Sequence, residues 1–185
     1  MSTLMFGGSF DPVHLGHLAL AEFAQAESGA GRVLFVPASR APLRENAPAP
    51  FAARVAMLRL ALAGTRFEID EREAGRSGPS FTVDTLEELA AGGCGPLLLL
   101  LGADQLAQFR RWQRWERVLE LAQLLVVNRP GWSAPPDAVP HRALRWPGME
   151  LSATWLRQRL AAGAPCRHLL PAGVWEYVEE EGLYR

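Results

Sequence analysis

The sequence has no lysine, two cysteines, almost no net charge and no long apolar run. All 19 basic residues are arginine, a bias that we attribute to genome composition rather than to chemistry. The formal net charge of −1 predicts neither a nucleic acid nor a membrane surface as a partner. An anionic small molecule remains a candidate ligand, because local arginine clusters focus an electrostatic field where their charges converge.

Cys94 and Cys166 have neither a CxxC spacing nor a histidine arrangement typical of structural zinc, which favours a reduced, intracellular protein. The longest apolar runs, residues 96–101 and 121–127, are far shorter than the roughly 20 residues of a membrane helix. The N-terminal segment lacks the basic and apolar regions of a signal peptide. We therefore expect a cytoplasmic protein, folded as one domain over residues 1–185.

Apolar runs typical of buried strands alternate with segments of helical spacing along the chain. We expect strands at 3–6, 32–37, 66–70, 96–101 and 123–131, an edge strand at 141–146, and helices from 15, over 51–63, from about 82, over 114–122, from 152 and over 172–182. This alternation predicts an α/β fold around a mostly parallel sheet. Three segments, residues 7–17, 39–44 and 102–104, each follow a strand. They should converge, because ligands of such sheets bind beyond the carboxyl ends of the strands.

The segment "GGSFDPVHLGH" carries the densest pattern. Gly7 and Gly8 remove side chains where we expect a sharp turn, and can leave amides facing an anion. His14 lies at or just before a helix start and His17 in its first turn, so both share one face where free amides favour phosphate. Gly16 lets a ligand come close. The structural alternative is that His14 caps the helix and His17 packs on the loop.

The segment resembles the [HT]xGH signature of a nucleotidyltransferase superfamily, and other stretches narrow the resemblance to the bacterial nicotinate-nucleotide adenylyltransferases. These stretches are "VPASRAPLR", "SFTVDTL", "LGADQL", "FRRWQRWERVLELAQLLVVNRPGW", "LSATWLRQRL" and "YVEEEGLYR", and the resemblance covers nearly the whole chain. It implies a Rossmann-like, three-layer fold. It also implies transfer of the adenylyl group of ATP to nicotinate mononucleotide, which gives nicotinate adenine dinucleotide and pyrophosphate in NAD biosynthesis.

The nucleophile of this reaction is already an anion, so the site must align two anions and stabilise the leaving pyrophosphate rather than remove a proton. The resemblance implies catalytic roles for His14, His17 and Arg157, with Mg²⁺ carried by ATP and no metal held by protein side chains. The implied ATP-binding residues are Gly7, Gly8, Ser9, Phe10, His14, Gly16, His17, Gly102, Asp104, Ser152, Thr154 and Arg157.

Two places depart from the family pattern. Ala153 replaces a serine of the motif "SSTxxR", which leaves Thr154 and the backbone amides as phosphate donors. Where the family usually has "PPHK", this chain has Ala41, Pro42, Leu43 and Arg44. Arg44 keeps the charge of this phosphate loop with a different geometry, whereas Leu43 removes a donor.

The acceptor site is expected around a helix start near Thr82. If Thr82 caps that helix, the free amides of Val83 and Asp84 suit a nicotinate carboxylate. The resemblance adds Thr85, and places Trp112 on the pyridine ring. Trp115 is expected in the core.

Asp104 suits ribose hydroxyls, with a helix N-cap as the structural alternative. Arg110, Arg111, Arg114 and Arg117 form a basic run that we interpret as a solvated helix face rather than a nucleic-acid site. Rival functions are adenylyl transfer to nicotinamide mononucleotide or phosphopantetheine, and a nucleotide-binding regulator without turnover. The "WxxWExxL…NRPG" segment argues against the phosphopantetheine enzyme. The substrates are therefore expected to be small molecules. A homo-oligomer is compatible with the sequence.

Overall fold

The structure, a computed structural model, describes residues 1–40, 49–127, 134, 138–149 and 151–185. Its strands are β1 (Thr3–Gly8), β2 (Arg32–Pro37), β3 (Glu68–Ile69), β4 (Leu97–Gly102), β5 (Ala122–Val127) and β6 (Arg142–Leu144). Its α-helices are α1 (Leu15–Ser28), α2 (Phe51–Leu62), α3 (Thr82–Ala91), α4 (Ala103–Ala107), α5 (Trp115–Leu121), α6 (Ala153–Ala161) and α7 (Ala172–Glu180). Three short 3₁₀ helices are η1 (Arg72–Gly75), η2 (Phe109–Arg111) and η3 (Arg167–Leu169).

The strands form one sheet in the order β3-β2-β1-β4-β5-β6. Within the described ranges, every pairing between neighbouring strands is parallel. The chain builds outward from β1 to β2 and β3, then crosses to β4 on the other side of β1. The order of the strands thus reverses between β1 and β4, which is where a sheet of this kind opens a crevice for a ligand.

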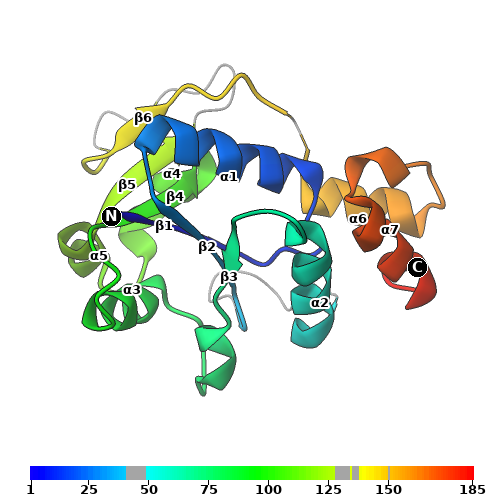
Figure 1. The fold of residues 1–185 in the computed structure, drawn as a ribbon, viewed down its shortest axis with the longest axis horizontal. Coiled ribbons are helices and arrows are strands. Elements are labelled where there is room, and N and C mark those ends of the chain that lie inside the picture. The colour runs from blue at the N-terminus through cyan, green and yellow to red at the C-terminus, as the bar shows by residue number, and fades with distance from the viewer. Residues whose placement is uncertain (41–48, 128–133, 135–137, 150) are drawn as a thin grey trace.

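Helices cover both faces of the sheet, so the fold has three layers (Figure 1). Side chains alternate along each strand between two apolar clusters. In β1, Leu4 and Phe6 join the cluster under α1, α2, α6 and α7, whereas Met5 joins the cluster under α3, α4 and α5. The predicted α/β class with a mostly parallel sheet is confirmed. None of the helices in the described part of the chain is long and apolar enough to cross a membrane.

The first strand ends later than the sequence predicts. Gly7 and Gly8 belong to β1 and pair with Val36 and Pro37 of β2, so the prediction of a sharp turn at the two glycines is wrong. A ladder bonds through the backbone and needs no side chain, which is why the strand continues through them. The turn comes at Asp11 and Pro12, directly after Phe10, whose φ of 49° lies in the left-handed region.

Candidate active site

A cavity of about 980 Å³ lies at the carboxyl ends of β1 and β4. Its wall includes the segment after β1, Ala38 after β2, Gly102 at the end of β4, and the starts of α3 and α6. The convergence of the segments after β1 and β4 is thus confirmed. For the segment after β2, residues 41–48 lie outside the described part of the chain. The predictions on Ala41, Pro42, Leu43 and Arg44 fall there.

Most of the predicted site residues line this one cavity. They are Gly7, Gly8, Ser9, Phe10, His14, Gly16, His17, Thr82, Gly102, Asp104, Trp112, Ser152, Thr154 and Arg157. They come from segments spread over residues 7–157 of the sequence, so tertiary folding gathers them. Val83 and Thr85 are fully buried behind the cavity wall.

The two histidines form a stacked pair at the start of α1. Their ring centroids lie 3.7 Å apart, with 24° between the planes. His14 occupies the N-cap position, and its backbone amide donates to His17 Nδ1 at 3.2 Å. Because Nδ1 accepts this bond, the proton of the neutral His17 ring sits on Nε2, which makes Nε2 a donor.

Burial controls the charge of His14. His14 is 4% exposed, and desolvation lowers its pKa from 6.5 to about 4. In the ligand-free protein His14 is therefore a neutral imidazole near pH 7. Gly16 explains how its ring fits, since a Cβ on Gly16 would lie 3.0 Å from His14 Nδ1 and 3.5 Å from the Leu151 Cβ. The close approach that Gly16 permits is thus that of the His14 ring and Leu151.

The start of α6 forms a second wall. Ser152 is its N-cap, and the Ser152 hydroxyl accepts from the Trp155 amide at 3.2 Å. Arg157 lies one turn later. Its Nη1 donates to the Asp11 carbonyl at 2.7 Å, and its Nη2 donates to the Thr154 hydroxyl at 3.3 Å. Arg157 therefore joins the segment "GGSFDPVHLGH" to the segment "SATWLR", and is not a purely solvated residue.

Asp104 lies in the first turn of α4, whose N-cap is Gly102. The alternative that Asp104 caps this helix is therefore wrong. Its carboxylate is exposed, lines the cavity and accepts from Gln105 Nε2 at 3.2 Å. The absence of a side chain at Gly102 matters here, because a Cβ would lie against the Asp104 carboxylate.

The start of α3 differs from the expectation by one residue. Phe81 occupies the N-cap position and Thr82 is the first helical residue, so the prediction that Thr82 caps the helix is wrong. The amides of Asp84 and Thr85 donate to the Phe81 carbonyl. The amides without a partner inside the helix are consequently those of Thr82 and Val83.

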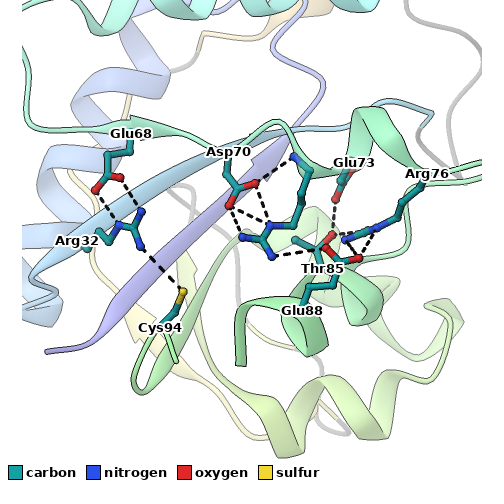
Figure 2. Close-up of polar contacts among 9 residues, drawn as sticks. Arg32, Glu68, Asp70, Glu73, Arg76, Thr85, Glu88 and Cys94 are labelled. Atoms are coloured by element: carbon teal, nitrogen blue, oxygen red, sulfur yellow. Dashed lines mark hydrogen bonds and ion pairs between the residues drawn. The ribbon is translucent and has the colours of Figure 1, made fainter. Parts of the chain in front are cut away.

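Thr85 has a structural role on the inner side of α3. Its hydroxyl donates to Glu73 Oε1 at 2.7 Å and accepts from Arg76 Nη1 at 2.8 Å (Figure 2). Arg76 in turn pairs with Glu88 at 2.8 Å. This network fixes η1 against α3 and uses the Thr85 hydroxyl as both donor and acceptor, so in the ligand-free protein the side chain is bonded to η1 and its neighbour Arg76. Burial raises the pKa of Glu73, which also lines the cavity.

The aromatic and basic residues around η2 have separate roles. Trp112 is half-buried, lines the cavity and packs on Phe109 at 5.1 Å between centroids. Trp115 contacts the same phenyl ring at 6.5 Å between centroids, does not line the cavity and packs partly buried against the core, as expected for a core residue.

The basic run does not form one helix face, because it spans η2, Arg114 in a left-handed conformation, and α5. Arg114 pairs with Asp84 and Glu87 of α3, and Arg117 pairs with Glu87. These exposed charges therefore meet acidic partners on the neighbouring helix.

Arg54 is a further residue of the site that was not among the predicted ones. It holds the backbone of two segments that line the cavity. It is 2% exposed, and its guanidinium donates to the carbonyls of Ser9 and Ala38, both at 2.8 Å, and of Ala49 at 3.3 Å. One buried cation thus ties the segment after β1 to the segment after β2. Its signal in the sequence is an arginine inside the apolar run 51–58.

The parallel sheet, its open switch point and the histidine pair at a helix start are those of a nucleotidyltransferase. The chain belongs to the Cytidylyltransferase-like family, whose profile matches residues 5–159. Among the described residues, no three histidine, cysteine, aspartate or glutamate side chains form a group that could hold a metal ion.

Relatives place the chain more narrowly, in the nicotinate-nucleotide adenylyltransferases of that family. A protein of Roseiflexus sp. (strain RS-1) named "Probable nicotinate-nucleotide adenylyltransferase" is 42% identical over 192 residues, which cover 98% of this chain and 96% of that protein. A protein of Serratia proteamaculans (strain 568) with the same name is 37% identical over 98% of this chain and 94% of its own length. The nicotinic acid mononucleotide adenylyltransferase of Plasmodium falciparum complexed with NaAD has the same fold, with a TM-score of 0.84 at 14% identity over 99% of this chain and 97% of that one.

Proposed function

We propose that the protein transfers the adenylyl group of ATP to nicotinate mononucleotide, releasing pyrophosphate and forming nicotinate adenine dinucleotide. The observation that carries the proposal is the stacked pair His14 and His17 at the N-terminus of α1, facing the same cavity as the start of α3. Two helix N-termini on one cavity suit two anionic substrates that must be brought together.

The phosphate of nicotinate mononucleotide attacks the α-phosphorus of ATP, and the bond to the pyrophosphate breaks. The acceptor phosphate is an anion at neutral pH, so no side chain has to remove a proton. In this proposal His17 donates from Nε2 to the α-phosphate, where negative charge builds up in the transition state. His14 is neutral without ligand, and a bound triphosphate would favour its protonated form.

Arg157 would stabilise the phosphates from the side of α6, assisted by the amides that follow Ser152. Its bond to the Asp11 carbonyl sets the guanidinium beside the histidine segment before any nucleotide binds. The phosphate side of the cavity is completed by backbone groups and by the space left without bulky side chains, at Gly7, Gly8, Ser9, Phe10 and Gly16. We assign the ribose of ATP to Gly102 and Asp104. Mg²⁺ would enter as the ATP complex and neutralise phosphate charge, and Arg44 is proposed to bind phosphate from the segment after β2.

The acceptor is assigned to the start of α3. The amide of Thr82, which lines the cavity, and the amide of Val83 behind it lie at the positive end of the helix dipole, which suits the nicotinate carboxylate. Trp112 offers an aromatic face for the pyridine ring. Nicotinamide is neutral and gains less from these amides, so we expect the acid to be preferred over the amide.

The test is a pyrophosphate-release assay with Mg·ATP and one of three acceptors: nicotinate mononucleotide, nicotinamide mononucleotide or phosphopantetheine. We expect the highest kcat/KM with nicotinate mononucleotide. Equal values for the acid and the amide would refute the carboxylate assignment. Turnover only with phosphopantetheine would reassign the enzyme, and no release with any acceptor would favour a regulator. A single domain, a cytoplasmic location and a homo-oligomer stay proposals alongside this function.

A further inference from the structure

Tyr184, which follows α7, reaches back to the segment after β1. Its hydroxyl donates to Asp11 Oδ1 at 2.6 Å, across 173 residues of sequence. Asp11 is 2% exposed, and its carbonyl also accepts from Arg157 Nη1 at 2.7 Å. Asp11 is thus held through its side chain by one C-terminal residue and through its backbone by another.

The segment that Asp11 belongs to needs such support. Phe10, the residue before it, is a non-glycine residue with a φ of 49°, a strained conformation that persists only where neighbouring contacts hold it. On the other side of Phe10, the Ser9 carbonyl accepts from the buried Arg54 at 2.8 Å. The strained residue therefore sits between two anchored neighbours.

The anchored residue Asp11 lies close in sequence to the histidine pair. His14 comes three residues after Asp11, and Val13 between them is fully buried in the core. The two anchors at Asp11 and the packing of Val13 leave His14 little freedom to shift, and the His14 amide in turn holds His17 Nδ1. Burial and the neighbouring carboxylate raise the pKa of Tyr184 well above its usual range, so the hydroxyl keeps its proton and donates.

We propose that Tyr184 is a positioning residue for adenylyl transfer: by holding the Asp11 carboxylate, it fixes the segment that carries His14 and His17. It does not line the cavity, so it acts through Asp11 rather than on the substrates. The inference rests on the proposed roles of the two histidines. A displacement of reacting groups by about 1 Å can cost roughly 100-fold in rate, so a single lost hydrogen bond at this place is measurable.

The variant Tyr184→Phe removes the hydroxyl and keeps the ring. We expect kcat to fall about 10-fold or more, while KM for nicotinate mononucleotide changes less than about twofold, because the acceptor site at α3 is untouched. Tyr177→Phe, in α7, is the matched control and should keep the wild-type kcat. Thermal denaturation of both variants shows whether each is folded at the assay temperature.

A double-mutant cycle with Asp11→Asn and Asp11→Ala separates positioning from general stability. The amide of Asp11→Asn can still accept from the Tyr184 hydroxyl, whereas Asp11→Ala cannot, so Tyr184→Phe should have little further effect on kcat in the Ala background. A wild-type kcat for folded Tyr184→Phe, or the same fold-loss in the wild-type and Asp11→Ala backgrounds, would overturn the inference. If wild-type protein releases no pyrophosphate, or His17→Ala turns over normally, the proposed function has failed instead.

Discussion

Replacing His14 by asparagine should make the protein less sensitive to mild acid. His14 is buried as a neutral ring, with a pKa lowered from 6.5 to about 4 by desolvation. In the unfolded chain the same ring takes up a proton at the higher pH. The unfolded state therefore binds more protons between these two values, and the free energy of unfolding falls as the pH falls. The stability that comes from a neutral His14 is complete above pH 6.5 and is lost as the pH approaches 4.

The magnitude follows from the two pKa values. Between pH 7 and pH 4.5 the linkage relation gives a loss of roughly 2 to 3 kcal/mol from this one side chain. That is a large fraction of the stability of a typical domain. Asparagine stays neutral over this range and suits an N-cap position, so His14→Asn should lack this loss.

The assay is urea denaturation at pH 7 and pH 4.5, followed by circular dichroism. Carboxyl groups also titrate in this interval, so the measured quantity is the difference between wild type and variant. We expect the wild type to lose roughly 2 to 3 kcal/mol more than His14→Asn. His168→Asn is the matched control, since it removes an exposed histidine and should follow the wild type. An identical pH dependence for wild type and His14→Asn would refute the reasoning that burial keeps this ring neutral.

Three further variants test the site. His17→Ala should lower turnover at least ~100-fold with little effect on Tm, and near-normal turnover would contradict its role in stabilising transition-state charge. Arg54→Met leaves the Ser9 and Ala38 carbonyls without their buried donor and should cost about 3 kcal/mol or more in urea denaturation, against less than about 1 kcal/mol for the exposed Arg59→Met in the same helix. An equal cost for the two arginines would show that the buried bonds contribute nothing. Asp104→Asn should raise KM for ATP about 10-fold without changing Tm, and an unchanged KM would remove Asp104 from the ribose site.

Much of the fold follows from local pattern. The apolar runs at 32–37 and 96–101 predict buried strands because a parallel strand is covered on both faces, and β2 and β4 lie there. Element boundaries were less well predicted. The local sequence predicts a turn at Gly7 and Gly8, yet both residues pair with β2 in the β1 ladder. Pairing depends on a neighbouring strand, about which local propensity carries no information.

The site, too, has one part that follows from local spacing and one part that depends on tertiary packing. The i, i+3 spacing of His14 and His17 places both rings on one face of α1, and the structure brings them into a stacked pair. The role of Thr85 could not be derived in this way, because its partners Glu73 and Arg76 lie outside its helix, and only the packing of η1 on α3 brings them to its hydroxyl.

The sequence by itself determined the class of fold, the order of its elements and the residues of the two phosphate motifs, because these depend on periodicity and on spacing within a single turn or loop. The tertiary structure alone decided the protonation of His14, the anchoring of the strained segment at Phe10, and the contacts of Arg54 and Tyr184 with it. The physical reason is that desolvation and buried hydrogen bonds depend on which distant groups exclude water from a side chain. In this protein those groups lie up to 173 residues away.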